Sequence, residues 1–206
     1  MDTKKQVVTL KHQGDSIKVT PGLYEIANLY YNFESNVRKH ITEICSPYCS
    51  SCEAPCCNSD FCIESIGNLW LSLVRELFQS YVPEYSKTDG WLTPKGCALT
   101  AGRPPVCYDY FCPPLLKGIN NRDKEYAVNV MGRLVDHVGD CGPGQRHLVV
   151  LIHKAQLYKI NKDKFYQHLG AAQEALRACC EVFRNGCMTT TSRESLEKIL
   201  VYPEKL

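Results

Sequence analysis

The chain has 206 residues, enough for a hydrophobic core and short enough for one domain, so we expect a single domain over residues 1–206. Its 24 Lys and Arg residues and 22 Asp and Glu residues give a formal net charge of +2, which argues against a nucleic-acid partner. No uninterrupted apolar run approaches the ~20 residues that cross a bilayer, so we expect no membrane partner.

The start of the chain predicts a β-hairpin followed by a helix. Short alternating patterns at Gln6 to Leu10 and at Ser16 to Thr20 flank a turn at Gly14-Asp15. Pro21 occupies the favoured first position of a helix that leads directly into Cys45. The apolar residues of this helix recur every three or four positions and form one face: Ile26, Tyr30, Phe33, Val37, Ile41 and Ile44.

Two segments hold nine of the 13 cysteines. The first cysteine block, residues 45–62, reads CSPYCSSCEAPCCNSDFC, and the second cysteine block, residues 96–112, reads GCALTAGRPPVCYDYFC. Short spacings such as C-x2-C let two sulfurs reach one metal ion, because a tight turn brings both side chains to the same side. The first block is rich in Ser, Pro, Asn and Asp, as loops are. The sequence therefore predicts a loop-built metal centre.

The chain between the blocks predicts one largely buried helix, about Glu64 to Tyr81, whose apolar residues cover two adjoining stripes. We expect Pro83 to end this helix and a loop to run from Glu84 to Pro94. In the second block, Arg103-Pro104-Pro105 stiffens the chain, because each proline fixes its own φ and restrains the residue before it.

The chain after the blocks begins with a predicted helix from its N-cap Asn121 to about Val138. The sequence GDCGPG at residues 139–144 ends this helix and places Cys141 in a turn. His147 to Ile152 is short, apolar and β-branched, which predicts a strand.

The C-terminal part contains the clearest helical period, from Lys162 to Arg184, with a C-cap at Asn185-Gly186. Thr191 and Glu194 form a capping box for a last helix through Leu200. The expected fold class is mainly α (α+β): helices around a loop-built cysteine metal centre, with a small N-terminal β-hairpin. The cysteine core would span about residues 45–115 and the helical remainder residues 116–206.

The block cysteines have three interpretations: metal ligands, disulfides, or packed core residues. Disulfides belong to oxidising compartments, whereas Met1 to Gln6 leads into an alternating run rather than a signal-peptide apolar segment, so we expect a cytoplasmic location. Core packing conflicts with the loop-like composition. We therefore favour metal ligands, and the expected set is Cys45, Cys49, Cys52, Cys56, Cys57, Cys62, Cys97, Cys107 and Cys112.

The arrangement of the thiols indicates which kind of metal centre they would form. Cys56 and Cys57 are adjacent, so they serve most easily as ligands of different ions or of different corners of a polynuclear cluster. One four-thiolate zinc site would also leave five of the nine block cysteines unused. Cys112 is followed by proline, as in some ferredoxin-type ligand runs. We expect an iron–sulfur cluster slightly ahead of zinc, since spacing alone does not separate two soft-ligand metals.

Both blocks carry a family resemblance. Four cysteines of the first block resemble the C-x2-C-x2-C-C signature of the YkgJ-like cysteine cluster family, which chelates zinc or iron: Cys49, Cys52, Cys56 and Cys57. The stretch from Cys97 to Cys107, with Arg103-Pro104 inside it, resembles the second signature of that family, C-x-I-Y-x2-R-P-x2-C. The likeness covers about residues 45–115 and implies a bound zinc, iron or iron–sulfur centre.

The chain departs from the family pattern at three places. Its first motif is C-x2-C-x3-C-C, one residue longer, and Leu99-Thr100 replaces the Ile-Tyr pair. Trp91 stands where the family usually has a further cysteine. One ligand must therefore be lost or replaced, and Cys45, Cys62 and Cys141 are available as substitutes.

The leading functional expectation is a cysteine-cluster metal-binding protein whose centre serves structure, electron transfer or protein modification. Its partner would be a metal ion, with a protein partner or substrate left open. One alternative is a protein lysine methylase-like enzyme, by analogy with the flagellin lysine methylase, a relative of the family. Another is a metal buffer or sensor whose surplus thiols bind exchangeably. The sequence contains no nucleophile elbow, P-loop or dinucleotide-binding fingerprint, so it leaves open whether the chain is an enzyme.

Several residues beyond these ligands also have alternative interpretations. Arg103 either offsets thiolate charge or lies exposed on a loop. His137 and Cys141, four residues apart, are either a ligand pair or a surface histidine and a turn cysteine. Cys179 and Cys180 fall on or beside an apolar helix stripe, so we expect both to be structural.

Overall fold

The computed structural model describes residues 8–12, 15–49, 52, 59–81, 84–93 and 96–202. These residues are mainly helical, as predicted. In chain order the α-helices are α1 (Pro21–Cys49), α2 (Ser59–Ile66), α3 (Leu69–Phe78), α4 (Val106–Asp109), α5 (Pro113–Ile119), α6 (Arg122–Gly139), α7 (Lys154–Leu157), α8 (Lys162–Asn185) and α9 (Thr190–Glu197). The strands and 3-10 helices are β1 (Val8–His12), β2 (Asp15–Val19), β3 (Leu92–Thr93), β4 (Gly96–Cys97), η1 (Pro143–Gln145) and η2 (Leu148–Val150).

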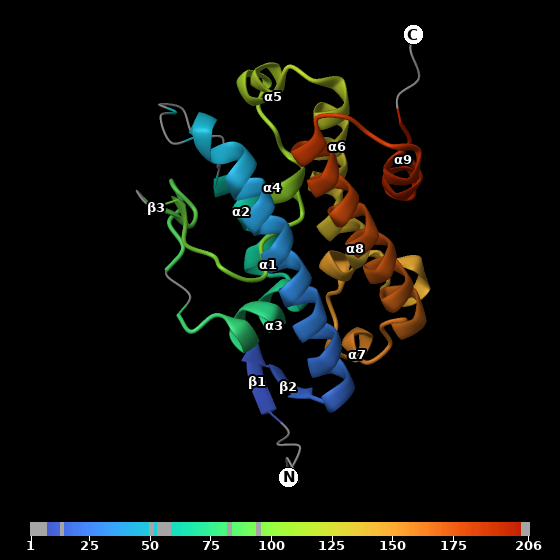
Figure 1. Ribbon diagram of the computed structural model, residues 1–206. Coiled ribbons are helices and arrows are strands. Elements are labelled where there is room, and N and C mark those ends of the chain that lie inside the picture. Colours follow the sequence, from blue (N-terminus) through green and yellow to red (C-terminus); the bar gives the residue numbers. More distant parts are fainter. Residues whose placement is uncertain are drawn as a thin grey trace, which may run out of the picture.

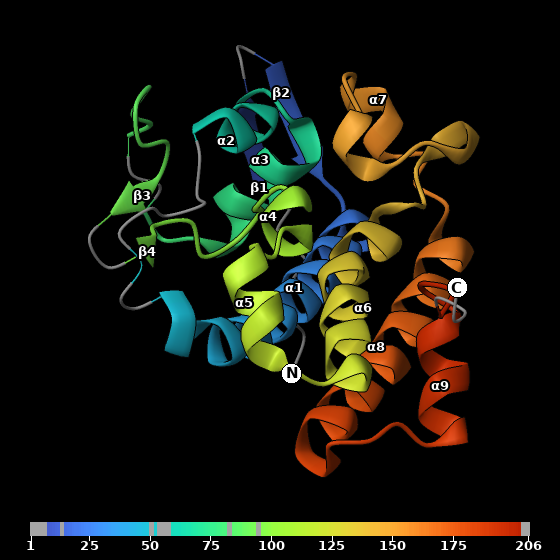
Figure 2. The same ribbon diagram turned by 90° about the horizontal axis from the view of Figure 1, so that it is seen from above.

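The core lies between four helices. α6 and α8 pack along each other, α1 packs against both, and α3 packs against α1 (Figures 1 and 2). Val37 from α1, Leu134 from α6 and Ala172 from α8 are fully buried. Trp70 of α3 meets Tyr30 of α1 edge to face, with ring centroids 5.4 Å apart. Among the described residues, no helix has both the length and the apolar character needed to cross a membrane.

Several predicted elements are confirmed. β1 and β2 form the antiparallel hairpin, with Val8 opposite Val19. Asn121 caps α6 by accepting a hydrogen bond from the Lys124 N–H at 2.9 Å. Gly186, at φ +75°, ends α8 in the left-handed conformation that favours glycine. The last helix begins earlier than predicted, because Thr189 is its N-cap.

The predicted single helix over residues 64–81 is wrong, because the structure has two helices, α2 and α3, on either side of Asn68. The Asn68 Oδ1 accepts a hydrogen bond from the Leu71 N–H at 2.8 Å, and its Nδ2 donates to the Val149 carbonyl. An asparagine that caps a new helix competes with continuation of the preceding one. This cap starts α3 at Leu69, and α3 ends at Phe78.

The predicted strand at His147 to Ile152 is also wrong. Residues 148–150 form the 3-10 helix η2, which begins where the Val149 N–H donates to His147 Nδ1 at 3.1 Å. Leu148 and Leu151 are buried, whereas Ile152 is 73% exposed. The two buried leucines are three residues apart, which matches one turn of a 3-10 helix rather than the alternation of a half-buried strand.

The expectation of a purely loop-built cysteine segment needs a correction as well. α1 continues past Ile44 to Cys49, so Cys45 and Cys49 lie on a helix, and Cys62 lies on α2. The ring of Tyr48 occupies the space that a Cβ on Gly118 of α5 would fill. This contact gives the last turn of α1 a packing partner, which explains why the helix extends into the first cysteine block.

Candidate metal centre

Each described block cysteine has a defined place in the fold. Cys45 and Cys49 are one turn apart on α1 and so share a helix face. The Cys52 N–H donates to the Cys49 carbonyl at 3.3 Å. The remaining positions are Cys62 on α2, Cys97 in β4, Cys107 in α4 and Cys112 at the N-cap of α5. Cys56 and Cys57 lie outside the described residues.

Contacts between elements join the two blocks. The C-terminal end of α1 contacts α5, which directly follows Cys112. Phe61 of α2 packs near Tyr110 of the second block, with ring centroids 6.1 Å apart. Figures 1 and 2 both place the end of α1, β3 and α5 on the side of the molecule away from α9. The segments that carry the predicted ligands are therefore neighbours.

Cys62 lies against the loop that precedes the second block. A Cβ on Gly90, which has φ +61°, would lie 2.6 Å from the Cys62 Sγ. The Tyr85 hydroxyl in the same loop donates to the Ser59 carbonyl of α2 at 3.3 Å. Trp91 is buried against Arg75, whose guanidinium is 5.6 Å from the indole ring centre. Cys62 therefore lies beside Gly90, the residue that precedes Trp91.

The thiols do not form a complete ligand set by themselves within the described residues. In that part of the chain, no three His, Cys, Asp or Glu side chains come close enough together to hold one metal ion. The structure thus brings the cysteine-bearing segments together without bringing three described ligands to one point.

Burial separates the block cysteines from two of the four cysteines of the helical remainder, whereas Cys180 is half-buried and Cys187 is exposed. All seven described block cysteines are exposed or half-buried, whereas Cys141 and Cys179 are buried. Burial raises the pKa of the Cys141 thiol to about 12, and it raises the pKa of Cys179 as well. The Cys179 Sγ donates to the Ala127 carbonyl at 3.2 Å. These two thiols stay protonated and pack as small hydrophobic groups.

A buried carboxylate on α1 holds the second block. Glu34 is 1% exposed, and its Oε1 accepts hydrogen bonds from the Arg103 N–H at 2.8 Å and from the Tyr108 hydroxyl at 2.9 Å. Its Oε2 accepts from the Gly102 N–H at 2.9 Å. Burial raises the pKa of Glu34, and these donors lower it in part. Sequence reasoning missed this residue, although a glutamate one turn after Tyr30 on an apolar face is a signal.

Two side chains of the α3 region hold the same block from the other side. Arg75 is buried and donates from Nη1 to the Gly102 carbonyl at 2.8 Å and from Nη2 to the Ser65 carbonyl at 2.7 Å. Burial lowers the pKa of Arg75 to about 10. The Gln79 Oε1 accepts from the Thr100 N–H at 2.8 Å. The connector between Cys97 and Cys107 is therefore fixed by buried or half-buried groups from two helices.

Arg103 is half-buried rather than exposed. It donates from Nε to the Leu99 carbonyl at 2.7 Å and from Nη2 to the Cys97 carbonyl at 3.3 Å. Burial alone would lower the pKa of Arg103, but Tyr108, the thiols of Cys97 and Cys107, and Glu34 raise it above its ordinary value. The guanidinium is therefore a fixed positive charge beside two predicted ligands, which favours the charge-offsetting interpretation over the exposed loop arginine.

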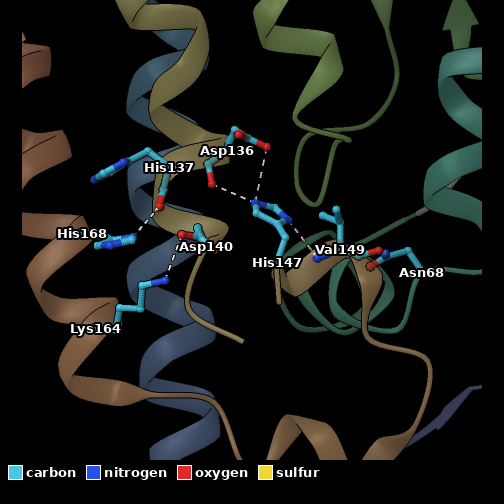
Figure 3. A network of polar contacts seen from close by, with 8 residues as sticks. All are labelled: Asn68, Asp136, His137, Asp140, His147, Val149, Lys164 and His168. Atoms are coloured by element: carbon cyan, nitrogen blue, oxygen red, sulfur yellow. Dashed lines mark hydrogen bonds and ion pairs between the residues drawn. The ribbon is translucent and has the colours of Figure 1, made fainter. Parts of the chain in front are cut away.

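His137 lies in a separate polar network at the junction of α6 and α8 (Figure 3). Its ring stacks on that of His168, with centroids 4.3 Å apart, and the His168 Nδ1 is 2.8 Å from the His137 carbonyl oxygen. Lys164 of α8 pairs with Asp140 at 2.9 Å. Cys141 is fully buried in the turn after α6. The network thus joins two helices through His137 and His168.

Comparison of the chain with protein-family models, with curated proteins and with solved structures finds no match.

Proposed function

We propose that the chain is a cysteine-cluster metal-binding protein whose centre takes thiols from both cysteine blocks. The observation that carries this proposal is the contrast in burial: the described block thiols are accessible and lie on contacting segments, whereas Cys141 and Cys179 are core residues. Accessible thiols gathered on adjacent segments suit soft metals, while buried thiols suit packing. The resemblance of the motifs to the YkgJ-like cysteine cluster family supports the same proposal.

The donor set fits a thiolate-bound metal by its chemistry. The residues that would hold the metal are Cys45, Cys49, Cys52, Cys56, Cys57, Cys62, Cys97, Cys107 and Cys112. Cys62 is our choice for the missing family ligand, because its Sγ lies against Gly90, the neighbour of Trp91. Binding of one metal centre by thiols from both blocks would couple to local folding of the segments that carry them.

We favour an iron–sulfur cluster over zinc, because nine block thiols exceed the need of one four-thiolate zinc site and the vicinal pair suits a polynuclear cluster. A cluster would supply electron transfer, whereas zinc would supply structural cross-linking. A reducing compartment such as the cytoplasm would keep the thiols available for either metal.

A metal buffer or sensor is the second candidate. Cys49, Cys52 and Cys107 are exposed, and ligands at the surface exchange metal more readily than buried ones. Dialysis against a chelator separates the two candidates: a structural or redox centre keeps its metal, whereas a buffer loses it.

Purification without oxygen, followed by an absorption spectrum and metal analysis, tests the proposal. We expect brown protein with a broad absorption band that bleaches on reduction, together with iron and acid-labile sulfide. Colourless protein with about two zinc ions per chain would replace the cluster by zinc and retain the thiolate centre. Protein that binds neither metal while its block cysteines remain reduced would refute the proposed function.

A further inference from the structure

We propose that Glu34 is a positioning residue of the thiolate centre: its buried carboxylate fixes the chain between Cys97 and Cys107 and thereby sets the affinity of the centre for metal. This inference rests on the proposed function. Glu34 lies on α1, away from every predicted ligand in the sequence, and it acts on the thiols through the backbone and the side chains of the second block.

The contacts of Glu34 span the connector between two predicted ligands. Its carboxylate accepts hydrogen bonds from the N–H groups of Gly102 and Arg103, which lie between Cys97 and Cys107. It also accepts from the hydroxyl of Tyr108, the residue after Cys107. One carboxylate therefore holds both the middle of the connector and the residue next to the second thiol.

Arg103 connects Glu34 with the backbone at Cys97. Glu34 holds the Arg103 backbone N–H, while the guanidinium of the same residue reaches back to the carbonyls of Leu99 and Cys97. The side chain is thus held at both ends. The guanidinium is thus fixed against the backbone that carries Cys97, so that a shift of Arg103 would move this predicted ligand.

The carboxylate also relates the two cysteine blocks to each other. α1 carries Glu34 on its buried face and Cys45 and Cys49 in its last turns. The helix that supplies thiols of the first block therefore also anchors the second block. Burying a carboxylate costs free energy unless hydrogen bonds compensate for the lost water, and here the compensating donors all belong to the second block.

The variant Glu34→Gln tests this role, because its amide keeps the size of the side chain but loses the charge and presents an NH2 group to a donor. We would measure cobalt(II) binding to the reduced protein by competition with a chelator and record the thiolate–cobalt charge-transfer band. We expect cobalt(II) affinity to fall about 10- to 100-fold, as for other groups that orient metal ligands, and the band to change.

Two further variants sharpen the comparison. Glu25→Gln alters an exposed glutamate of the same helix, which accepts a hydrogen bond from the Tyr166 hydroxyl, and should bind cobalt(II) like the unchanged chain. Tyr108→Phe removes one donor to Glu34 and should cause a smaller loss of affinity. Circular dichroism checks that each variant is folded.

A second readout separates this inference from the proposed function. Alkylation rates of Cys97 and Cys107 in the metal-free protein, resolved by mass spectrometry, should change in Glu34→Gln, while exposed Cys187 keeps its rate. If the unchanged chain binds no cobalt(II), the alkylation rates alone decide the role of Glu34, and the iron and zinc content of the protein decides the proposed function. Folded Glu34→Gln with unchanged affinity, spectrum and rates would overturn the inference. If Glu34→Gln does not fold, Tyr108→Phe decides by the same criteria.

Discussion

Cys179 lies between α6 and α8, where its thiol donates to the Ala127 carbonyl at 3.2 Å. Since burial raises the pKa of this thiol, it stays protonated and contributes packing. We expect Cys179→Ala to lower the free energy of unfolding by about 1–2 kcal/mol and to leave the metal content unchanged. Denaturant unfolding and metal analysis measure the two effects. Cys180→Ala, at a half-buried position, should cost less, and loss of metal from either folded variant would contradict a structural role.

His137 gives a prediction for the pH dependence of stability. Burial lowers its pKa, with a further contribution from stacked His168 and from Lys164, while Asp136 and Asp140 act in the opposite direction. Because the pKa is lower in the folded protein, the unfolded chain binds more protons as the pH falls through the ordinary range of histidine. The free energy of unfolding therefore decreases through this histidine as the pH falls from about 7.5 to about 5.

Urea unfolding at several pH values measures this effect. His137→Gln removes the titrating group and should make the dependence on pH shallower than in the unchanged chain. His153→Gln, at an exposed position, is the matched control and should keep the original slope. Equal slopes for the unchanged chain and His137→Gln would show that His137 does not carry the effect.

At the scale of elements, the second cysteine block depends on a glycine. Gly102 has φ +60°, and an added Cβ would overlap the Leu71 carbonyl of α3. Gly144 has a similar φ of +66° but no heavy atom within 4 Å of an added Cβ, which makes it a matched control. Gly144→Ala should cost about 1–2 kcal/mol from the left-handed backbone alone. We expect Gly102→Ala to lower the free energy of unfolding by more than that.

Chemical denaturation of both variants measures the difference. The substitution Gly102→Ala should also affect the proposed metal centre, because the shift that relieves the overlap at Gly102 moves the connector between Cys97 and Cys107. We expect Gly102→Ala, and not Gly144→Ala, to change the alkylation rates of these two cysteines. Equal destabilisation by the two substitutions would mean that the connector is not closely packed on α3.

Local signals were sufficient to predict several elements of this fold. The hairpin follows from the alternation around Gly14-Asp15, and α6 and α8 follow from apolar periods with an N-cap at Asn121 and a C-cap at Gly186. The wrong predictions arose where a side chain makes a specific local bond. Asn68 begins a new helix, and His147 caps a 3-10 turn, and an apolar pattern alone reveals neither bond.

The candidate site likewise has one part that the sequence predicts and one part that it does not. Cysteine spacing identifies the predicted ligands, since it is a property of the chain itself. The groups that hold the second block could not be predicted, because Glu34 and Arg75 reach Gly102 only after α1, α3 and the block have packed together. The sequence carried one usable signal, a glutamate on an apolar helix face.

At the scale of the whole molecule, α1 links the helical core to the cysteine segments. Its first turns pack beside the hairpin and α3, and its last turns carry Cys45 and Cys49 beside α5 (Figure 1). The core formed by α1, α6 and α8 contains the buried Cys179, whereas Cys45 and Cys49 lie in the last turns of α1 and Cys112 lies at the N-cap of α5. α1 thus sets where Cys45 and Cys49 lie relative to α5.

The metal content of chains altered in one block at a time tests the central claim most directly. The variants are the pair Cys49→Ser and Cys52→Ser in the first block, the pair Cys97→Ser and Cys107→Ser in the second block, and Cys187→Ser outside both blocks as the control. Purified without oxygen, each paired variant should lose bound metal, because the centre takes thiols from both blocks. The control should keep the metal content of the unchanged chain. A folded variant that lacks the thiols of one block and still holds the full metal content would contradict a centre shared by the two blocks.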